Sequence, residues 1–206
     1  MVPEVIEASE EGLLFEYLEP GSEDSLALAQ GLAELHQSEE SRFGFESNNF
    51  IGLTEQRNSW SKNWPEFFIK RRLRFQAQLG EDKGWFRESE EFEAYLERVR
   101  LILSEDEIQP SLLHGDLWSG NVYWSSKGPA LIDPAVYFGD SEADLAFSEM
   151  FGGFSSQFYQ KYFSLRKKTS AYSIKKRIYN LYHLMNHANI FGGSYCQQVR
   201  HELGVV

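Results

Sequence analysis

Cysteine is nearly absent from this chain of 206 residues, whose single cysteine is Cys196. One cysteine cannot form an intrachain disulfide, which suits a reducing compartment. Apolar runs long enough to span a membrane are absent too, and no basic segment precedes an apolar run at the start of the sequence. We therefore expect a soluble cytoplasmic protein that has no membrane partner.

Basic residues are scarce relative to acidic ones, with 20 lysines and arginines against 31 aspartates and glutamates and a formal net charge of -11. Such a surface repels polyanions, so nucleic acid is not expected as a partner. A local basic run over residues 161–177 is predicted to be a solvated helix face and loop, because charge runs usually are. The hydrophobic share of 42% and the aromatic share of 15% are typical of a packed core.

Apolar spacing predicts the main elements. The clearest helix covers residues 89–103, where Phe92, Leu96, Val99 and Leu103 form one apolar stripe. A strand is predicted within residues 13–18, a long ordered loop over 41–64, and a helix that begins at Pro65. Further helices are predicted at 22–36, 141–150, 155–165 and 173–190, and a hairpin is predicted from strands at 122–124 and 130–132.

Residues 114–121, which read H-G-D-L-W-S-G-N, carry the strongest functional signal. In kinase catalytic loops an H-x-D motif is followed by Asn five residues after the Asp, and then by a second Asp at a nearby strand end. Asp116 and Asn121 have this offset, and Asp133 follows a short apolar run. One carboxylate can take the proton of an attacking hydroxyl, while an amide oxygen and a second carboxylate hold magnesium against phosphates.

The alternative is that Asp116 and Asn121 only cap turns, as short polar residues often do. Asp133 argues against it, because a structural carboxylate that closes an apolar strand is costly to leave unpaired. His183 and His187, four residues apart on a predicted helix, raise the further alternative of a metal site. The glutamate of a metalloprotease helix is missing between them, so they are interpreted as core or surface histidines.

Together with residues 132–135 (I-D-P-A) and 139–146 (G-D-S-E-A-D-L-A), the loop resembles the fructosamine kinase (ketosamine-3-kinase) family. This family is related to the aminoglycoside and choline phosphotransferases and has a protein-kinase-like fold. Residues 43–68 and 186–193 extend the resemblance to nearly the whole chain. One departure is Ser141, where family members often have Arg; the lost surface ion pair would cost under about 1 kcal/mol.

The resemblance implies an α+β, mainly α fold, namely the C-terminal helical lobe of a protein-kinase-like enzyme with small β-hairpins at the catalytic loop. Residues 1–20 would be a remnant strand and hinge of the N-terminal lobe, and residues 21–206 the catalytic and substrate lobe.

The resemblance also implies roles for single residues. Asp116 would be the catalytic base, and Asn121 and Asp133 the magnesium ligands. Trp118 would be a wall of the substrate pocket, although a core aromatic under the loop is an equal alternative. The remaining roles would be adenine binding by the backbone of Glu16, Tyr17 and Leu18, orientation of the loop by His114, and support of the loop by a buried Asp144.

The implied reaction is ATP- and Mg²⁺-dependent phosphorylation of a ketosamine hydroxyl, on a small molecule or on protein-linked adducts, as a step of deglycation. The alternatives are another small-molecule kinase of the aminoglycoside or choline type, and a non-catalytic pseudo-kinase that serves as a binding module.

A kinase also needs a Gly-rich loop over the phosphates and a strand lysine. The first lysine here is Lys62, after the hinge-like run, and no G-x-G-x-x-G precedes it. A single preorganised donor contributes about 2.7–4 kcal/mol, so the chain alone is expected to show little or no turnover. Apolar surface near residues 13–18 would be uncovered, which predicts self-association.

Overall fold

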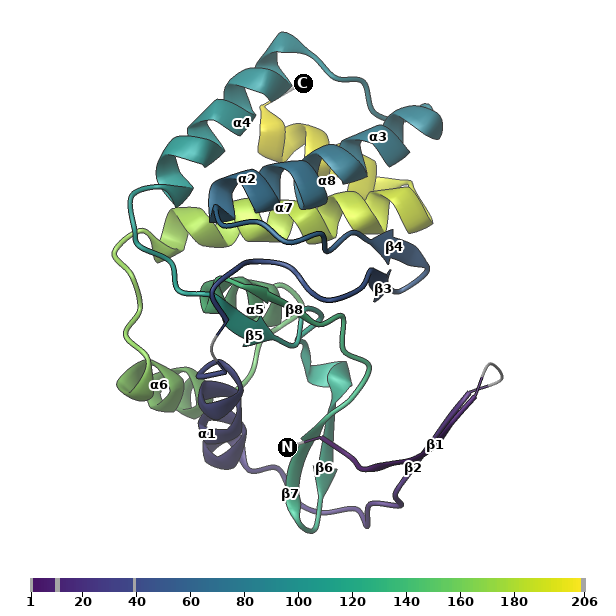
Figure 1. The fold of residues 1–206 in the computed structure, drawn as a ribbon, viewed down its shortest axis with the longest axis vertical. Helices are drawn as coiled ribbons and strands as arrows, with labels where there is room; N and C mark the ends of the chain where they lie inside the picture. The colour runs from purple at the N-terminus through teal and green to yellow at the C-terminus, as the bar shows by residue number, and fades with distance from the viewer. Residues whose placement is uncertain (1, 10–11, 39, 205–206) are drawn as a thin grey trace.

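The computed structural model describes residues 2–9, 12–38 and 40–204, and Figure 1 shows a helical body from which an N-terminal hairpin projects. Four antiparallel two-stranded sheets lie within the described residues. They pair β1 (Val5–Ala8) with β2 (Leu13–Phe15), β3 (Asn49–Ile51) with β4 (Thr54–Gln56), β5 (Ser111–Leu113) with β8 (Tyr137–Gly139), and β6 (Val122–Ser125) with β7 (Gly128–Leu131).

The helices account for most of the body, which confirms the mainly α fold. They are α1 (Ser25–Leu35), α2 (Trp64–Phe68), α3 (Arg74–Asp82), α4 (Glu90–Leu103), α5 (Ser141–Ser148), α6 (Ser156–Leu165), α7 (Tyr172–Phe191) and α8 (Ser194–Leu203). A π-helical turn, η1 (Ile69–Leu73), joins α2 to α3, and a 3-10 turn, η2 (Ser119–Asn121), precedes β6.

Short polar side chains define where several helices begin. The Ser89 hydroxyl accepts the N–H of Phe92 and starts α4, whose predicted apolar stripe is buried. The first helix begins later than residue 22, because the Asp24 carboxylate accepts the N–H of Ala27 and so caps α1. Pro65 lies in the first turn of α2, as predicted.

Two apolar cores meet at residues 114–121, the predicted catalytic loop, which is called the catalytic loop below. One gathers α2, α3, α4, α7 and α8, and it includes Leu113 just before the loop. The other gathers α1, α6 and the β6–β7 hairpin, and it includes Leu117 within the loop. The residues between Leu113 and Leu117 are therefore anchored by packing on both sides, which limits their freedom to move.

Residues 41–64 do not form the plain loop that the sequence predicts, because they contain the β3–β4 hairpin. Side-chain amides hold it in place: Gln56 Nε2 donates to Asn49 Oδ1 at 2.9 Å and to the Ala135 carbonyl at 3.0 Å. Polar residues with long-range partners replace the apolar alternation by which a strand is usually recognised. Helix α8 was also not predicted.

The basic run over residues 161–177 is not solvated throughout, so that prediction is wrong for Lys175. Its ammonium group is buried, 2.8 Å from a carboxylate oxygen of Asp140 and 2.9 Å from one of Glu142. Burial alone would lower the pKa of Lys175, but the negative charges of Asp140 and Glu142 outweigh it and raise the pKa. The ion pairs tie α7 to the start of α5, the helix that carries Asp144.

Candidate active site

The catalytic loop follows β5 and turns at a glycine that no other residue can replace without strain. Gly115 has a φ of 81°, and a Cβ at this position would lie 1.9 Å from the Ala135 carbonyl oxygen. The Ala135 N–H donates to the His114 carbonyl at 2.8 Å. The loop and the segment after Asp133 therefore cross in direct contact.

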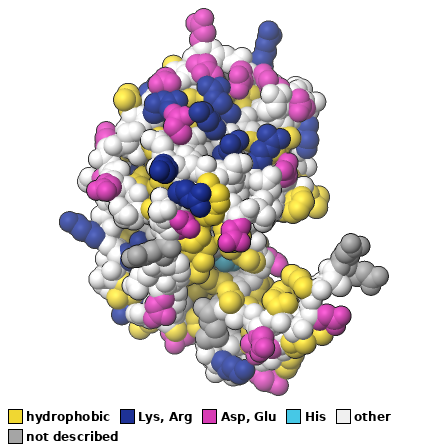
Figure 2. All heavy atoms as spheres, in the orientation of Figure 1, with side chains coloured by type: hydrophobic (Ala, Val, Ile, Leu, Met, Phe, Trp, Pro, Cys, Tyr) yellow, Lys and Arg dark blue, Asp and Glu magenta, His cyan; other side chains and the backbone are white. Residues whose placement is uncertain are grey.

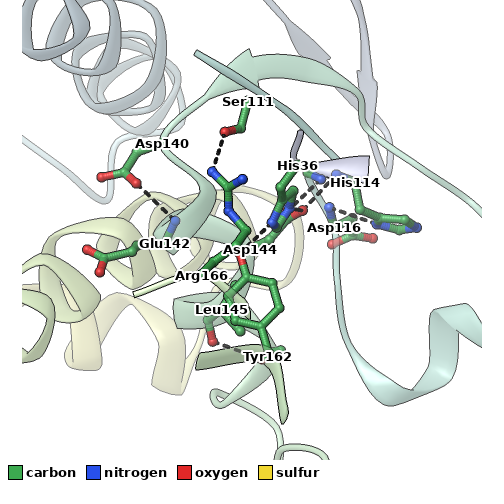
Figure 3. A network of polar contacts seen from close by, with 12 residues as sticks. His36, Ser111, His114, Asp116, Asp140, Glu142, Asp144, Leu145, Tyr162 and Arg166 are labelled. Carbon is green, nitrogen blue, oxygen red and sulfur yellow. Dashed lines mark hydrogen bonds and ion pairs between the residues drawn. The ribbon is translucent and has the colours of Figure 1, made fainter. Parts of the chain in front are cut away.

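Asp144 holds the loop from behind (Figure 3). Its carboxylate is buried and accepts the N–H of His114 at 2.7 Å and the N–H of Gly115 at 2.9 Å. Burial acts to raise the pKa of Asp144, but the hydrogen bond and charge of His36, with smaller contributions from His114 and the Gly115 N–H, keep it below its ordinary value. The side chain is thus a charged anchor for two backbone groups of the loop.

His36 completes this anchor, and sequence reasoning missed it. Its Nε2 lies 3.1 Å from an oxygen of Asp144, and its Nδ1 lies 2.7 Å from the hydroxyl of Tyr162. The imidazole is buried at the end of α1, which Figure 3 shows beside Asp144 and Tyr162. The signal in the sequence was a polar residue at the end of an apolar helix stripe, which by itself does not identify a partner.

His114 links the loop to the segment that carries Asp133. Its Nδ1 accepts the Asp116 N–H at 3.3 Å, so its Nε2 is the nitrogen that donates to the Ile132 carbonyl, 2.9 Å away. The side chain is buried behind the loop. These contacts suit the orienting role that the resemblance implied.

Asp116 and Asn121 are in direct contact. The Asn121 Nδ2 donates to the Asp116 carbonyl at 2.8 Å and to its carboxylate at 3.1 Å. Burial raises the pKa of Asp116, and the hydrogen bond from Asn121 opposes this only in part. A carboxylate with a raised pKa is the better proton acceptor near neutral pH. Because the amide nitrogen is used on Asp116, the oxygen of the Asn121 carboxamide is the atom left to face a cation.

The β6–β7 hairpin brings the backbone just before Asp133 to Asn121. The Asn121 carbonyl accepts the N–H of Ile132 at 3.0 Å, which extends the ladder to the residue before Asp133. The Asp133 carboxylate is exposed, so the argument that a buried charge would be costly there is wrong. Among the described residues, Asp133 is the one non-glycine position with positive φ, at 51°. Such strain collects at functional sites.

The hinge-like residues lie against the same hairpin. The Tyr123 hydroxyl donates to the Leu18 carbonyl at 3.0 Å, and the Lys127 ammonium lies 3.2 Å from the Glu16 carboxylate. The Glu16 N–H already donates to the Glu4 carbonyl. Within the part of the chain that the structure describes, the Glu16 carbonyl and the Leu18 N–H have no hydrogen-bond partner, while the Tyr17 side chain is 75% exposed.

A cavity of about 390 Å³ opens beside Asp116. Trp118 lines it and is 37% exposed, so the alternative of a core aromatic under the loop is wrong. His187 also lines the cavity, and its Nδ1 donates to the His183 carbonyl at 2.7 Å. His183 is buried and stacks on Phe147 at a ring distance of 3.6 Å.

Within residues 2–9, 12–38 and 40–204, no helix is long and apolar enough to cross a membrane. No group of three or more His, Cys, Asp or Glu side chains gathers there in a way that could hold a metal ion. A magnesium site at Asn121 and Asp133 would be of another kind, since phosphate oxygens would supply other ligands.

The fold is that of the helical lobe of protein-kinase-like proteins. The solved gentamicin complex of APH(2")-IIa matches the whole chain with a TM-score of 0.58 at 15% identity, a likeness of fold alone. A candidate fructosamine-3-kinase from Thermobifida fusca has a TM-score of 0.90 at 25% identity over 99% of this chain and 73% of its own. A second candidate fructosamine-3-kinase, from Haemophilus somnus, has a TM-score of 0.84 at 30% identity, over 93% of this chain and 67% of its own.

The family follows from the sequence comparisons. The family model for fructosamine kinase matches residues 1–205. A probable ketoamine kinase from Vibrio parahaemolyticus is 44% identical over 86% of this chain and 62% of its own length, and the ketosamine-3-kinase of Mus musculus is 43% identical over 75% and 50%. The chain belongs to the fructosamine kinase family. It spans between half and two thirds of the length of these two relatives.

Proposed function

We propose that this chain takes part in ATP- and Mg²⁺-dependent phosphorylation of a ketosamine hydroxyl, on a small molecule or on a protein-linked adduct. The proposal is supported by the contact between Asn121 and Asp116, which lines the cavity, and by the hydrogen bond that joins Asn121 to Ile132, the residue before Asp133. The substrate class comes from the names of relatives, which include a protein-ribulosamine 3-kinase from Arabidopsis thaliana.

In this proposal Asp116 is the base. The acceptor hydroxyl donates to the Asp116 carboxylate, its oxygen forms a bond to the terminal phosphorus of ATP, the bond from that phosphorus to the bridging oxygen breaks, and the proton stays on Asp116. The raised pKa of Asp116 favours the transfer. His114 and Asp144 act only as positioning residues, because their contacts are to the loop backbone and not to the cavity.

The donor set fits a magnesium ion. A carboxamide oxygen and an exposed carboxylate are hard oxygen ligands, and the nitrogen of Asn121 is already turned toward Asp116. When bound, Mg²⁺ neutralises charge on the nucleotide phosphates. The adenine would bond to the Glu16 carbonyl and the Leu18 N–H, the two backbone groups left without a partner, beside the exposed Tyr17.

The division of the chain is part of the proposal. Residues 1–20 would act as a strand and hinge of an N-terminal lobe, and residues 21–206 as the catalytic and substrate lobe. The second part has apolar cores of its own, whereas every described residue of β1 and β2 is exposed. Without a Gly-rich loop and a strand lysine among the 206 residues, this chain alone turns over slowly.

Calorimetry and an acceptor panel test the proposal. We expect ATP to bind this chain only with Mg²⁺, and Asp133→Asn to abolish this magnesium-dependent binding. Any phosphotransfer should be slow, lost in Asp116→Asn, and higher with a ketosamine than with an aminoglycoside or choline. Nucleotide binding that ignores both magnesium and Asp133→Asn would favour the pseudo-kinase alternative, and robust Asp116-dependent turnover would contradict the slow rate.

Two further parts of the proposal concern the location of the protein in the cell and its self-association. A reducing cytoplasm suits a chain with one cysteine, which is buried at residue 196. The chain would also self-associate through the exposed apolar residues of the β1–β2 hairpin, because uncovered apolar surface favours association.

A further inference from the structure

Beside Asp116, one side of the cavity is built almost entirely from rings. Six aromatic or imidazole side chains line it, one of which, Phe147, is buried behind the others. The remaining five, which we term the aromatic wall, are Trp118, Phe151, His187, Phe191 and Tyr195. Three of these rings are poorly covered, with 37% of Trp118, 40% of Phe151 and 67% of Phe191 exposed. Large apolar rings left open around the half-buried Asp116 carboxylate indicate a surface that binds a ligand.

The rings form a continuous series although they come from separate segments. Ring centroids are 6.3 Å apart between Trp118 and Phe151, 5.4 Å between Phe151 and His187, and 5.7 Å between His187 and Phe191. The hydrogen bond from His187 Nδ1 to the His183 carbonyl fixes the central ring of the series. The wall is therefore arranged before any ligand arrives, which lowers the entropic cost of binding.

The charges around the cavity are of one sign. Among the described residues that line the cavity, Asp116 is the one acidic side chain, and none is a lysine or an arginine. His183, directly behind the wall, stays neutral because burial, helped by the nearby His187, lowers its pKa to about 3. The faces of aromatic rings attract cations, most strongly where no other cation competes.

We propose that the aromatic wall binds a protonated amine of the acceptor by cation–π contact, while Asp116 receives the hydroxyl that becomes phosphorylated. The ligand class is thus a polyhydroxylated compound that carries an ammonium group close to its reacting hydroxyl. The inference rests on the proposed function only for the role of Asp116. It extends that function by assigning recognition of the amine to Phe151, Phe191 and their neighbours.

A neutral sugar is the weaker candidate. A sugar without charge is recognised through several hydrogen-bonding groups, and the cavity offers few: Asp116, Asn186, and the polar atoms of His187 and Tyr195. The Asn186 oxygen already accepts the side-chain N–H of Gln76 at 3.3 Å. A ring-lined cavity with one anion discriminates by charge better than by hydroxyl pattern.

The test compares two probes that differ in charge, 1-amino-1-deoxyfructose and fructose, by calorimetry without nucleotide. We expect the aminated sugar to bind about 3- to 30-fold more tightly, the range of a cation–π contact. Phe191→Leu and Phe151→Leu keep an apolar side chain but remove the ring, and each should reduce the preference several-fold. Phe50→Leu is the matched control, because Phe50 is 65% exposed and does not line the cavity.

Three results would overturn the proposal that the aromatic wall binds an amine. Equal affinity for the two probes, no saturable binding of the aminated sugar, or an unchanged preference in both ring variants overturns the inference; in the last case the charge of Asp116 alone would be responsible. The proposed function fails separately. A chain that prefers the amine but never transfers phosphate keeps this inference, and one that phosphorylates both probes equally keeps only the function.

Discussion

The two sides of the catalytic loop differ sharply. Behind it lies a buried scaffold, formed by His36, His114 and Asp144, in which each side chain has a hydrogen-bond partner. In front lies an open edge, where Asp133 and Trp118 are exposed. Figure 2 shows hydrophobic side chains gathered along the hollow between the helical body and the N-terminal hairpin. The comparison teaches that the carboxylate that holds the loop, Asp144, is buried, whereas Asp133, a magnesium ligand in the proposed function, is exposed.

Removing the anchor of the scaffold should have the largest effect. Asp144→Ala leaves two backbone N–H groups and His36 without their acceptor in a buried site, so the free energy of unfolding should fall by about 3–5 kcal/mol. Urea denaturation of the wild-type chain and of Asp144→Ala measures this loss of free energy. The matched change on the open edge, Asp133→Asn, should stay within about 0.5 kcal/mol, because its carboxylate is exposed. Similar losses in both variants would remove the distinction between the two sides.

The buried ion pairs at the start of α5 extend the scaffold. Lys175→Met leaves Asp140 and Glu142 without their cation and should cost about 3 kcal/mol in urea denaturation. Lys167→Met is the control from the same basic run, and it should be near neutral because Lys167 is exposed. If the two lysines prove equivalent, the ion pairs do not support α5.

Acid should lower the free energy of unfolding, because it protonates the buried His183. Its pKa is about 3 in the folded protein, below the ordinary value of 6.5, so the unfolded chain binds more protons between these values. The contribution of neutral His183 to the free energy of unfolding is fully present above about pH 6.5. It is lost as the pH falls toward 3, by up to about 1.4 kcal/mol per pH unit. Denaturation between pH 6.5 and 4.5 should show a flatter slope for His183→Phe; equal slopes would contradict the prediction.

The smallest expected effect belongs to the hairpin β1–β2. Leu14→Lys should change the free energy of unfolding by less than about 0.5 kcal/mol, because Leu14 is exposed. If the hairpin mediates self-association, the same variant should shift sedimentation toward a monomer. A wild-type chain that already sediments as a single monomer would show that the exposed apolar residues have no such role.

Local patterns predicted much of the fold and of the reactive residues. The stripe of α4 and the β6–β7 hairpin are confirmed, since each depends on residues close in sequence. The offset between Asp116 and Asn121 predicted a pair that is in hydrogen-bond contact. A short sequence offset predicts a spatial contact here because a loop of a few residues has few ways to arrange its side chains.

Other features could not be predicted in this way. His36 and Asp144 are 108 residues apart in sequence, and no local pattern relates them. The burial of Lys175 was missed because a charged residue within a basic run resembles a solvated one until its acidic partners are known. The exposure of Asp133 was missed because the end of an apolar run does not reveal which way the next side chain faces.

The sequence by itself predicted the chemistry, since the residue types at 114–121 and 133 and their spacing are typical of a phosphotransfer loop. Only the tertiary structure decided which carboxylate is buried as an anchor, which is strained and exposed, and which rings meet beside Asp116. The physical reason is that burial and desolvation belong to the packed surroundings of a side chain, which distant segments supply together.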